Sequence, residues 1–193
     1  VGTLKYFEEL LFIHSARKLY YIASGWQTLQ GPSSNDLLPS GADTTTVLST
    51  STWNKHLFIT SSDLLQRPQK VFKNGSNAWC LRTAGMPALA SAPVPTGGTP
   101  GPTFSYLYRF LYRYTYTVGT RTYIDRGPAT EVTATNTTAI AAGAGNTISW
   151  ASIPALANST THNYDTSSTD LDVEIYRTTN GGVNFFLVSS VNN

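Results

Sequence analysis

The sequence contains little charge, a single cysteine and no long apolar run. Asp, Glu, Lys and Arg make up 12% of its 193 residues, about half the usual share. The net charge of +2 is too small to indicate a nucleic acid or an anionic membrane as the partner. The one cysteine, Cys80, excludes a disulfide framework within the chain and is expected to be a buried apolar side chain beside Trp79. No run approaches the roughly 18 apolar residues of a membrane-spanning helix, so we expect no membrane segment.

No catalytic signature stands out among the polar residues. The serines include no G-x-S-x-G nucleophile motif. His14 and His56 lie between apolar residues of expected strands, and neither has a second ligand at metal-binding spacing. We predict a structural role for both histidines. The chain is expected not to be an enzyme and to carry no catalytic, cofactor-binding or metal-binding residue.

One polar segment near the C-terminus allows two specific functional interpretations, a calcium site and a pair of catalytic carboxylates. His162 lies close to Asp165, Asp170 and Asp172, and clustered carboxylates can bind calcium, but the spacing is not that of an EF-hand and we expect a solvated loop. Asp172 and Glu174 fall on one face of an expected strand, roughly 7 Å apart. A pair at that separation suits a glycosidase only inside a cleft. We expect both carboxylates to face solvent.

The residues that replace charge are Thr, Ser, Asn and Gly, a composition common in secreted adhesins and viral structural proteins. An internal repeat runs through the first half. Leu11–Ser15 and Leu57–Ser61 share four of five residues at a separation of 46, and a period of roughly 40–50 residues with β-type units is typical of propeller blades. Two blades cannot bury their faces alone, and the chain begins at Val1 and ends within a strand-like pattern. We therefore expect a piece of a longer protein.

Short strands are expected throughout residues 1–84, which we predict to be a propeller-like β region. The segment 4–13 has some helical spacing, but its apolar run favours a buried strand. The pair Asn74-Gly75 predicts a type I′ hairpin turn. The expected strands span residues 10–13, 18–23, 44–49, 53–60 and 69–72.

Residues 85–103 contain five prolines and four glycines, a density that no strand or helix interior is expected to tolerate. We predict a linker here that contains the domain boundary. Residues 104–193 then form a dense β region. Six aromatic residues alternate with other types from Tyr106 to Tyr116, which places the six rings on one face of a long strand. Further strands are expected at 121–124, 129–135, 147–150, 171–177 and 184–191.

Five arginines lie among these aromatic residues. Basic residues interleaved with rings can bind single-stranded nucleic acid, but we favour a sheet with one aromatic core face and one Arg/Thr face toward solvent or an interface. The glycosylation sequons at Asn74, Asn136 and Asn158 are expected to arise by chance. The arginines are Arg109, Arg113, Arg121, Arg126 and Arg177.

The second half resembles a fibronectin type III sandwich. Trp150 is followed by Val173–Arg177, a turn at Asn180-Gly181-Gly182 and the run Phe185–Val188, as in the core tryptophan and middle hairpin of such modules. Upstream, Tyr112–Val118 and Ile124–Ala129 resemble the closing hairpin of such a module. The resemblance implies a fibronectin-like β-sandwich at 104–193.

A propeller-like region joined to this aromatic module resembles the tail nozzle proteins of short-tailed bacteriophages. The segments Trp53–Thr60 and Tyr112–Tyr116 carry the likeness, although only two blade-like units are visible. The resemblance implies a structural virion protein of the phage tail that forms a ring, expected to be a hexamer, around the DNA exit channel. Its partners would be copies of itself, neighbouring tail or adaptor proteins and, passively, the genome DNA during ejection.

The sequence therefore predicts an all-β chain: propeller-like or platform strands, then a fibronectin-like sandwich. The alternative is a carbohydrate-binding or adhesion module of a secreted or surface protein, with its tyrosine-rich strand contacting glycans. A hydrolase of envelope glycans would need a paired-acid cleft, which we do not find in the sequence.

Overall fold

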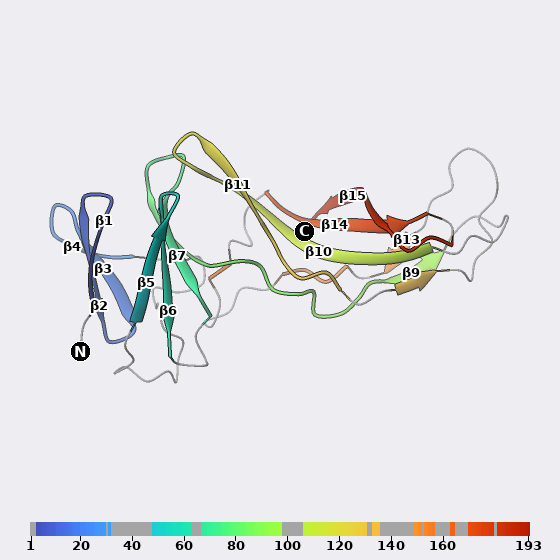
Figure 1. Cartoon of the computed structure of the whole chain (residues 1–193), viewed down its shortest axis with the longest axis horizontal. Coiled ribbons are helices and arrows are strands. Elements are labelled where there is room, and N and C mark those ends of the chain that lie inside the picture. Colours follow the sequence, from blue (N-terminus) through green and yellow to red (C-terminus); the bar gives the residue numbers. More distant parts are fainter. Residues whose placement is uncertain are drawn as a thin grey trace. The chain divides into compact units, whose positions relative to one another are not determined.

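The computed structural model is all-β (Figure 1), with no helix among the residues that it describes. These are residues 3–29, 31, 48–62, 67–97, 106–130, 133–135, 149–151, 153–156, 163–164, 170–179 and 181–193. The strands are β1 (Thr3–Phe7), β2 (Leu10–Ser15), β3 (Lys18–Ile22), β4 (Trp26–Thr28), β5 (Leu48–Trp53), β6 (His56–Ser61), β7 (Gln69–Lys73), β8 (Trp79–Thr83), β9 (Val94–Gly97), β10 (Tyr106–Val118), β11 (Arg121–Arg126), β12 (Thr133–Thr135), β13 (Ser149–Ala151), β14 (Leu171–Thr178) and β15 (Phe185–Asn192).

The chain forms two compact units, and each is assembled from three separate stretches. Unit 1 comprises Val1–Gly85, Thr115–Tyr123 and Ala157–Ser168, and unit 2 comprises Met86–Tyr114, Ile124–Leu156 and Thr169–Asn193. The tip of the β10–β11 hairpin thus belongs to unit 1 and the rest of it to unit 2. This interleaved division differs from the sequential arrangement of 1–84, 85–103 and 104–193 that the sequence favours.

The proline-rich segment 85–103 is not wholly a linker, because it contains β9. Pro95 of β9 lies opposite Trp150 of β13 in a two-stranded antiparallel sheet. A strand paired on one side needs only half of its backbone donors, so a proline can be accommodated there.

Unit 1 contains two four-stranded antiparallel sheets, each with its strands in sequence order. The first sheet is β1-β2-β3-β4, and the second is β5-β6-β7-β8 (Figure 1). Segment 4–13 is therefore a hairpin, not a helix, with a turn at Glu8 and Glu9, whose φ values are 47° and 65°. Two successive residues with positive φ are the mark of a type I′ turn, which matches the twist of the flanking strands.

Two expectations for the second sheet are wrong. The segment 53–60 is not one strand, because Asn54 and Lys55, with φ of 50° and 62°, form a two-residue turn between β5 and β6. The Asn74-Gly75 pair is not a type I′ turn either. Asn74 accepts the Asn77 amide at 2.9 Å and its side chain accepts the Ser76 and Ala78 amides. The residue with positive φ is Asn77, at 63°, so the turn is longer by three residues.

The sequence repeat corresponds to a structural repeat. The β1–β2 turn at Glu8–Glu9 and the β5–β6 turn at Asn54–Lys55 are separated by the same 46 positions as the repeated pentapeptides. Leu11–Ser15 lies in β2 and Leu57–Ser61 in β6, so each copy occupies the second strand of its sheet.

The two copies bury opposite faces. Phe12 is buried in the first sheet whereas Phe58, its repeat equivalent, is only half-buried, and Ile59 is buried whereas Ile13 is not. This is expected when two similar sheets stack in the same orientation. Each sheet buries the face turned toward the other, and these two faces are not equivalent in the repeat. Their shared core consists of Phe7, Phe12, Leu19, Leu29, Leu48, Leu57, Ile59, Val71 and Leu81.

Unit 2 is built on an antiparallel sheet of order β11-β10-β14-β15, with β12 paired to β10. The alternation along β10 is confirmed within this long strand, because Tyr108, Phe110 and Tyr112 are buried while the intervening residues are half-buried. Trp150 packs edge-on against Tyr108 and Phe110, with ring centroids 4.6 and 5.0 Å away. The core consists of Leu89, Tyr108, Phe110, Tyr112, Val173 and Ile175.

Candidate functional site: an exposed edge strand

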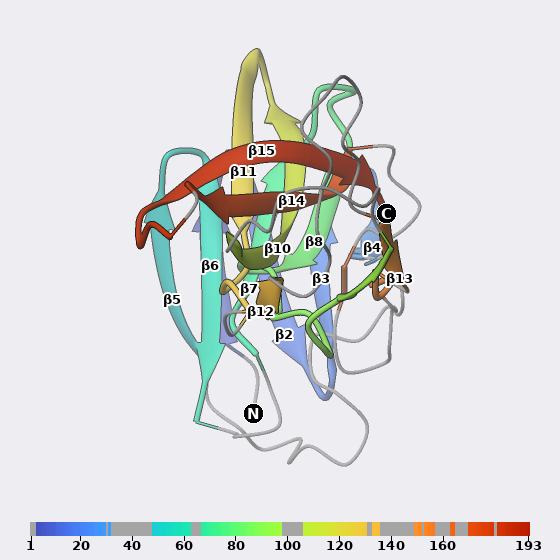
Figure 2. The same ribbon diagram turned by 90° about the vertical axis from the view of Figure 1, so that its right-hand side faces the viewer.

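The most exposed apolar strand of unit 2 is β15. It pairs with β14 in antiparallel register (Figure 2), and β14 is the only strand paired with it among the described residues. From Thr179 to the C-terminal Asn193 the sequence contains no charged residue and no proline. Four apolar side chains of β15 are at least 41% exposed: Phe186 (55%), Leu187 (52%), Val188 (46%) and Val191 (41%).

Such an edge is suited to pairing with another strand. An edge strand presents backbone N–H and C=O groups along its outer side, and natural proteins usually protect it with charge, proline or a bulge. The structure has one such device, a register shift between Ile175 and Tyr176 that leaves Val188 without an opposite residue on β14. The rest of the strand has no protecting charge, so the edge has the chemistry of an interface.

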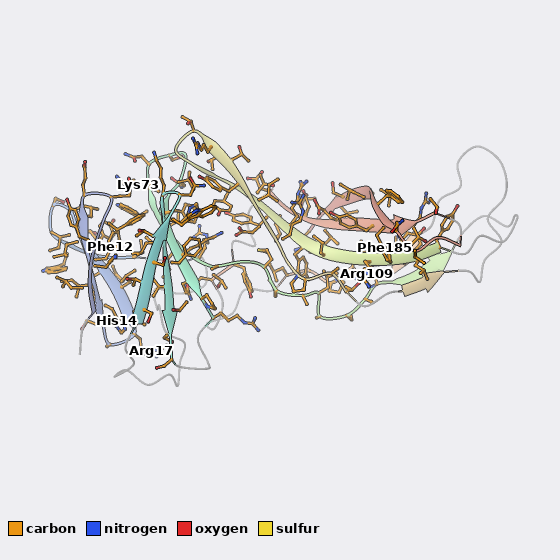
Figure 3. All side chains as sticks on the ribbon, in the orientation of Figure 1. Phe12, His14, Arg17, Lys73, Arg109 and Phe185 are labelled. Atoms are coloured by element: carbon orange, nitrogen blue, oxygen red, sulfur yellow. The ribbon has the colours of Figure 1, made fainter. Side chains whose placement is uncertain are left out.

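A cation–π contact fixes the beginning of β15. The Arg109 guanidinium of β10 lies 4.9 Å from the centroid of the Phe185 ring (Figure 3). Such a contact contributes about 0.5–1 kcal/mol at an exposed site. It holds the first residue of the strand against the sheet and leaves Phe186 and Leu187 exposed.

The polar face of the same sheet contains a charge network. Arg126 binds the Glu174 carboxylate with its Nε at 2.8 Å and its Nη2 at 3.0 Å, and the Tyr176 hydroxyl donates to Glu174 at 2.9 Å. Arg113 pairs with Asp172 and approaches Glu174 at 3.6 Å. The expectation that both carboxylates face solvent is therefore wrong for Glu174, whose side chain is fully buried.

The network favours the ionised form of Glu174. The hydrogen bond from Arg126 is the main cause that lowers the pKa of Glu174, against burial, which raises it. A general acid at neutral pH needs the opposite shift. Asp172 and Glu174 are both held in ion pairs with arginines.

The candidate calcium ligands are not brought together by the described part of the chain. Asp172 is paired with Arg113, while His162 and Asp165 lie outside the described residues. Among the described residues no group of three or more metal-ligating side chains is found.

Both described histidines are buried, as predicted for structural residues. His14 bonds the Ala16 carbonyl oxygen at 2.7 Å, and burial lowers its pKa. His56 lies in a cluster that sequence reasoning missed. Its Nε2 is 3.1 Å from the Tyr116 hydroxyl, to which the buried Lys70 ammonium donates at 2.9 Å. The segment Gln69–Lys73 contains two lysines, and nothing in its sequence distinguishes the buried Lys70 from Lys73, so the sequence contained no usable signal.

Most rings of the tyrosine-rich strand, which the sequence suggested for glycan contact, are not on the surface. Tyr108, Tyr112, Tyr114 and Tyr116 are all buried. The arginines are also engaged: Arg177 stacks on Tyr106 at 4.4 Å, and Arg109, Arg113 and Arg126 make the contacts above. Arg121 and Arg126 are exposed and the other three are half-buried. Cys80 is a buried thiol that forms no disulfide, as expected. The sequons at Asn136 and Asn158 lie outside the described residues.

Comparisons with known proteins return no relative. No family model matches the chain, and neither a curated protein nor a solved structure matches it. Across the described residues, no helix is long and apolar enough to span a membrane.

Proposed function

We propose that this chain is a structural protein that assembles with copies of itself, and that the β15 edge is an assembly surface. The observation that carries the proposal is an eight-residue edge strand with four exposed apolar side chains and no charge. Strand pairing across such an edge satisfies backbone groups and removes apolar area from water together.

The sheet arrangements support a more specific architecture. Two stacked four-stranded sheets, each in sequence order and related by a 46-residue repeat, are compatible with successive propeller blades. In unit 2, the β14–β15 hairpin and the Trp150 core contacts are compatible with a fibronectin-like module.

We assign the assembly to a bacteriophage tail on the resemblance to tail nozzle proteins. In that role the chain is part of a ring around the DNA exit channel, in contact with copies of itself and with neighbouring tail or adaptor proteins. The low charge of the sequence fits broad interfaces, whose cores are depleted in charged residues.

Light scattering after size exclusion and electron-microscope imaging test this proposal. We expect a concentration-dependent oligomer and, in images, rings or tubes around a central channel. Val188→Lys adds a charge to the exposed edge without removing a core contact, and it should raise the dissociation constant by tenfold or more, about 1.4 kcal/mol. Val183→Lys is the matched control, because Val183 is 78% exposed and precedes the strand. Monomers at every concentration, or normal assembly of the Val188→Lys variant, would overturn the proposal.

A further inference from the structure

Four turns of unit 1 surround a shallow surface depression. They are the β1–β2 turn, the β5–β6 turn, the β7–β8 turn and the β10–β11 turn, which contribute Glu8, Lys55, Asn74 and Gly119 to its lining. The turns lie at the same end of the strands (Figure 1). Figure 3 places Lys73 at this end, and His14 and Arg17 at the other end of the strands.

The depression has two adjoining parts that share Glu8 and Lys55. One part, of about 350 Å³, is also lined by Tyr6, Thr52, Trp53 and Asn54. The other, of about 200 Å³, is lined by Lys73, Asn74 and Asn77. Volumes of this order fit small ligands.

Two aromatic side chains in the larger part are unusually exposed. Tyr6 and Trp53 are each 67% exposed, although burying a ring of this kind removes roughly 150–250 Å² from water. The repeat equivalent of Tyr6 is Thr52, so a large ring is not required at that position of the hairpin. The repeat equivalent of Trp53 is Phe7, which is buried in the core, whereas Trp53 is exposed and adds nothing to the core.

Two contacts hold parts of the lining in place. The Asn54 backbone carbonyl accepts from His56 Nδ1 at 2.8 Å and from the Tyr123 hydroxyl at 3.4 Å, which fixes the β5–β6 turn. In the smaller part, the Lys73 ammonium lies 5.0 Å above the Trp79 ring. A lining that is ordered before a ligand arrives loses less conformational entropy on binding.

We propose that this depression binds a neutral oligosaccharide. The apolar C–H face of a hexose packs on an exposed ring such as Trp53, while its hydroxyls exchange hydrogen bonds with carboxylate, amide and ammonium groups. The lining offers all three of these groups in Glu8, Asn54 and Lys55. In the larger part, where the rings lie, the charges of Glu8 and Lys55 cancel, so neither an anionic nor a cationic ligand is favoured there over a neutral one.

The site and the assembly surface use different residues: the lining residues belong to unit 1 and β15 belongs to unit 2. The site also differs from the tyrosine-rich strand that the sequence suggested for glycan contact. The rings that are available to a sugar are Tyr6 and Trp53, not the buried tyrosines of β10.

Titration calorimetry and saturation-transfer NMR test the proposal with four probes: cellohexaose, maltohexaose, laminarihexaose and mannohexaose. We expect at least one to bind and to quench tryptophan fluorescence. Trp53→Ala should weaken that binding about tenfold or more and abolish most of the quenching. Trp26→Ala is the matched control, since Trp26 is 58% exposed but does not line the depression.

Equal melting temperatures of the two variants establish that both are folded. Trp53→Phe should retain part of the affinity because it keeps an aromatic face. Absence of binding by all four probes at millimolar concentration, or equal affinity of the Trp53→Ala and Trp26→Ala variants, would overturn the site. The Val188→Lys variant should bind the oligosaccharide as the unmodified protein does, so failure of the assembly proposal leaves this result unaffected.

Discussion

Arg126 and Glu174, 48 positions apart in the sequence, form a two-point ion pair within unit 2, with Nε–Oε2 and Nη2–Oε1 distances of 2.8 and 3.0 Å. The carboxylate is buried while the guanidinium side chain remains 44% exposed. Glu174 also accepts the Tyr176 hydroxyl. The pair joins β11 to β14 across the intervening strand β10.

Glu174→Gln should destabilise the protein by about 2 kcal/mol, because the substitution removes the charge and leaves arginine donors facing an amide. The cost stays below that of a fully buried pair since water can solvate the exposed Arg126. Urea unfolding followed by circular dichroism measures it. Glu9→Gln, in the exposed β1–β2 turn, is the control and should cost less than about 0.5 kcal/mol.

The same pair predicts an acid dependence of stability. The pKa of folded Glu174 lies below its ordinary value of 4.5, so the unfolded state binds the proton first. The stabilisation is therefore complete above the unfolded pKa and is lost as the pH falls below about 4.5 through the folded value. The stability difference between the unmodified protein and Glu174→Gln should narrow from pH 7 to pH 3. A constant difference over this range would contradict the prediction.

Gly127→Ala should be severely destabilising. A Cβ at this position would lie well inside contact distance of the Pro87 carbonyl oxygen, a backbone atom that cannot rotate away. Overpacking of this kind costs typically 1–3 kcal/mol and occasionally more. Gly75→Ala is the comparison, because its nearest atom is the Thr117 hydroxyl at 2.6 Å, which a side-chain rotation can move.

Thermal unfolding should therefore give a much lower melting temperature for Gly127→Ala than for Gly75→Ala. The double variant Gly75→Ala, Thr117→Ala should recover the loss that Gly75→Ala causes. If Gly127→Ala has the same melting temperature as the unmodified protein, the close approach to Pro87 does not exist in solution.

Tyr116→Phe should cost about 1–3 kcal/mol, because it removes the hydroxyl that contacts the buried Lys70 ammonium and His56. Tyr123→Phe removes a more exposed hydroxyl with a 3.4 Å contact and should cost less than about 0.5 kcal/mol. Denaturant unfolding of the two variants measures the difference. Equal stabilities would show that the Tyr116 hydroxyl does not support Lys70.

Much of the strand pattern could be predicted because it depends on local alternation. The aromatic row of β10 and the Leu171, Val173 and Ile175 face of β14 are buried as expected. The turns were harder to predict from the sequence, because Glu8–Glu9 and Asn54–Lys55 contain no glycine and yet adopt positive φ. There the twist of the paired strands outweighs the intrinsic backbone preference of the residues.

The candidate sites depend on contacts between distant residues, and these left little trace in the sequence. Glu174 looked solvent-facing because alternation alone cannot show that Arg126 covers it. Tyr6 and Trp53 are separated by 47 positions and line one depression only because their turns lie at the same end of unit 1. The edge position of β15 likewise follows from the sheet order and not from its own composition.

The interleaved composition of unit 1 sets the order in which it can fold. Thr83 exchanges hydrogen bonds with Asn163, and Tyr116 supplies the hydroxyl contact of Lys70, so residues made late in synthesis complete a unit begun at its start. The apolar core of the first two sheets lies within residues 7–81 and does not include these later residues. Bringing together residues this far apart in the sequence costs conformational entropy before the stabilising contacts form. The polar contacts of Lys70 and Thr83 are therefore the part of unit 1 that forms only once these later residues are present.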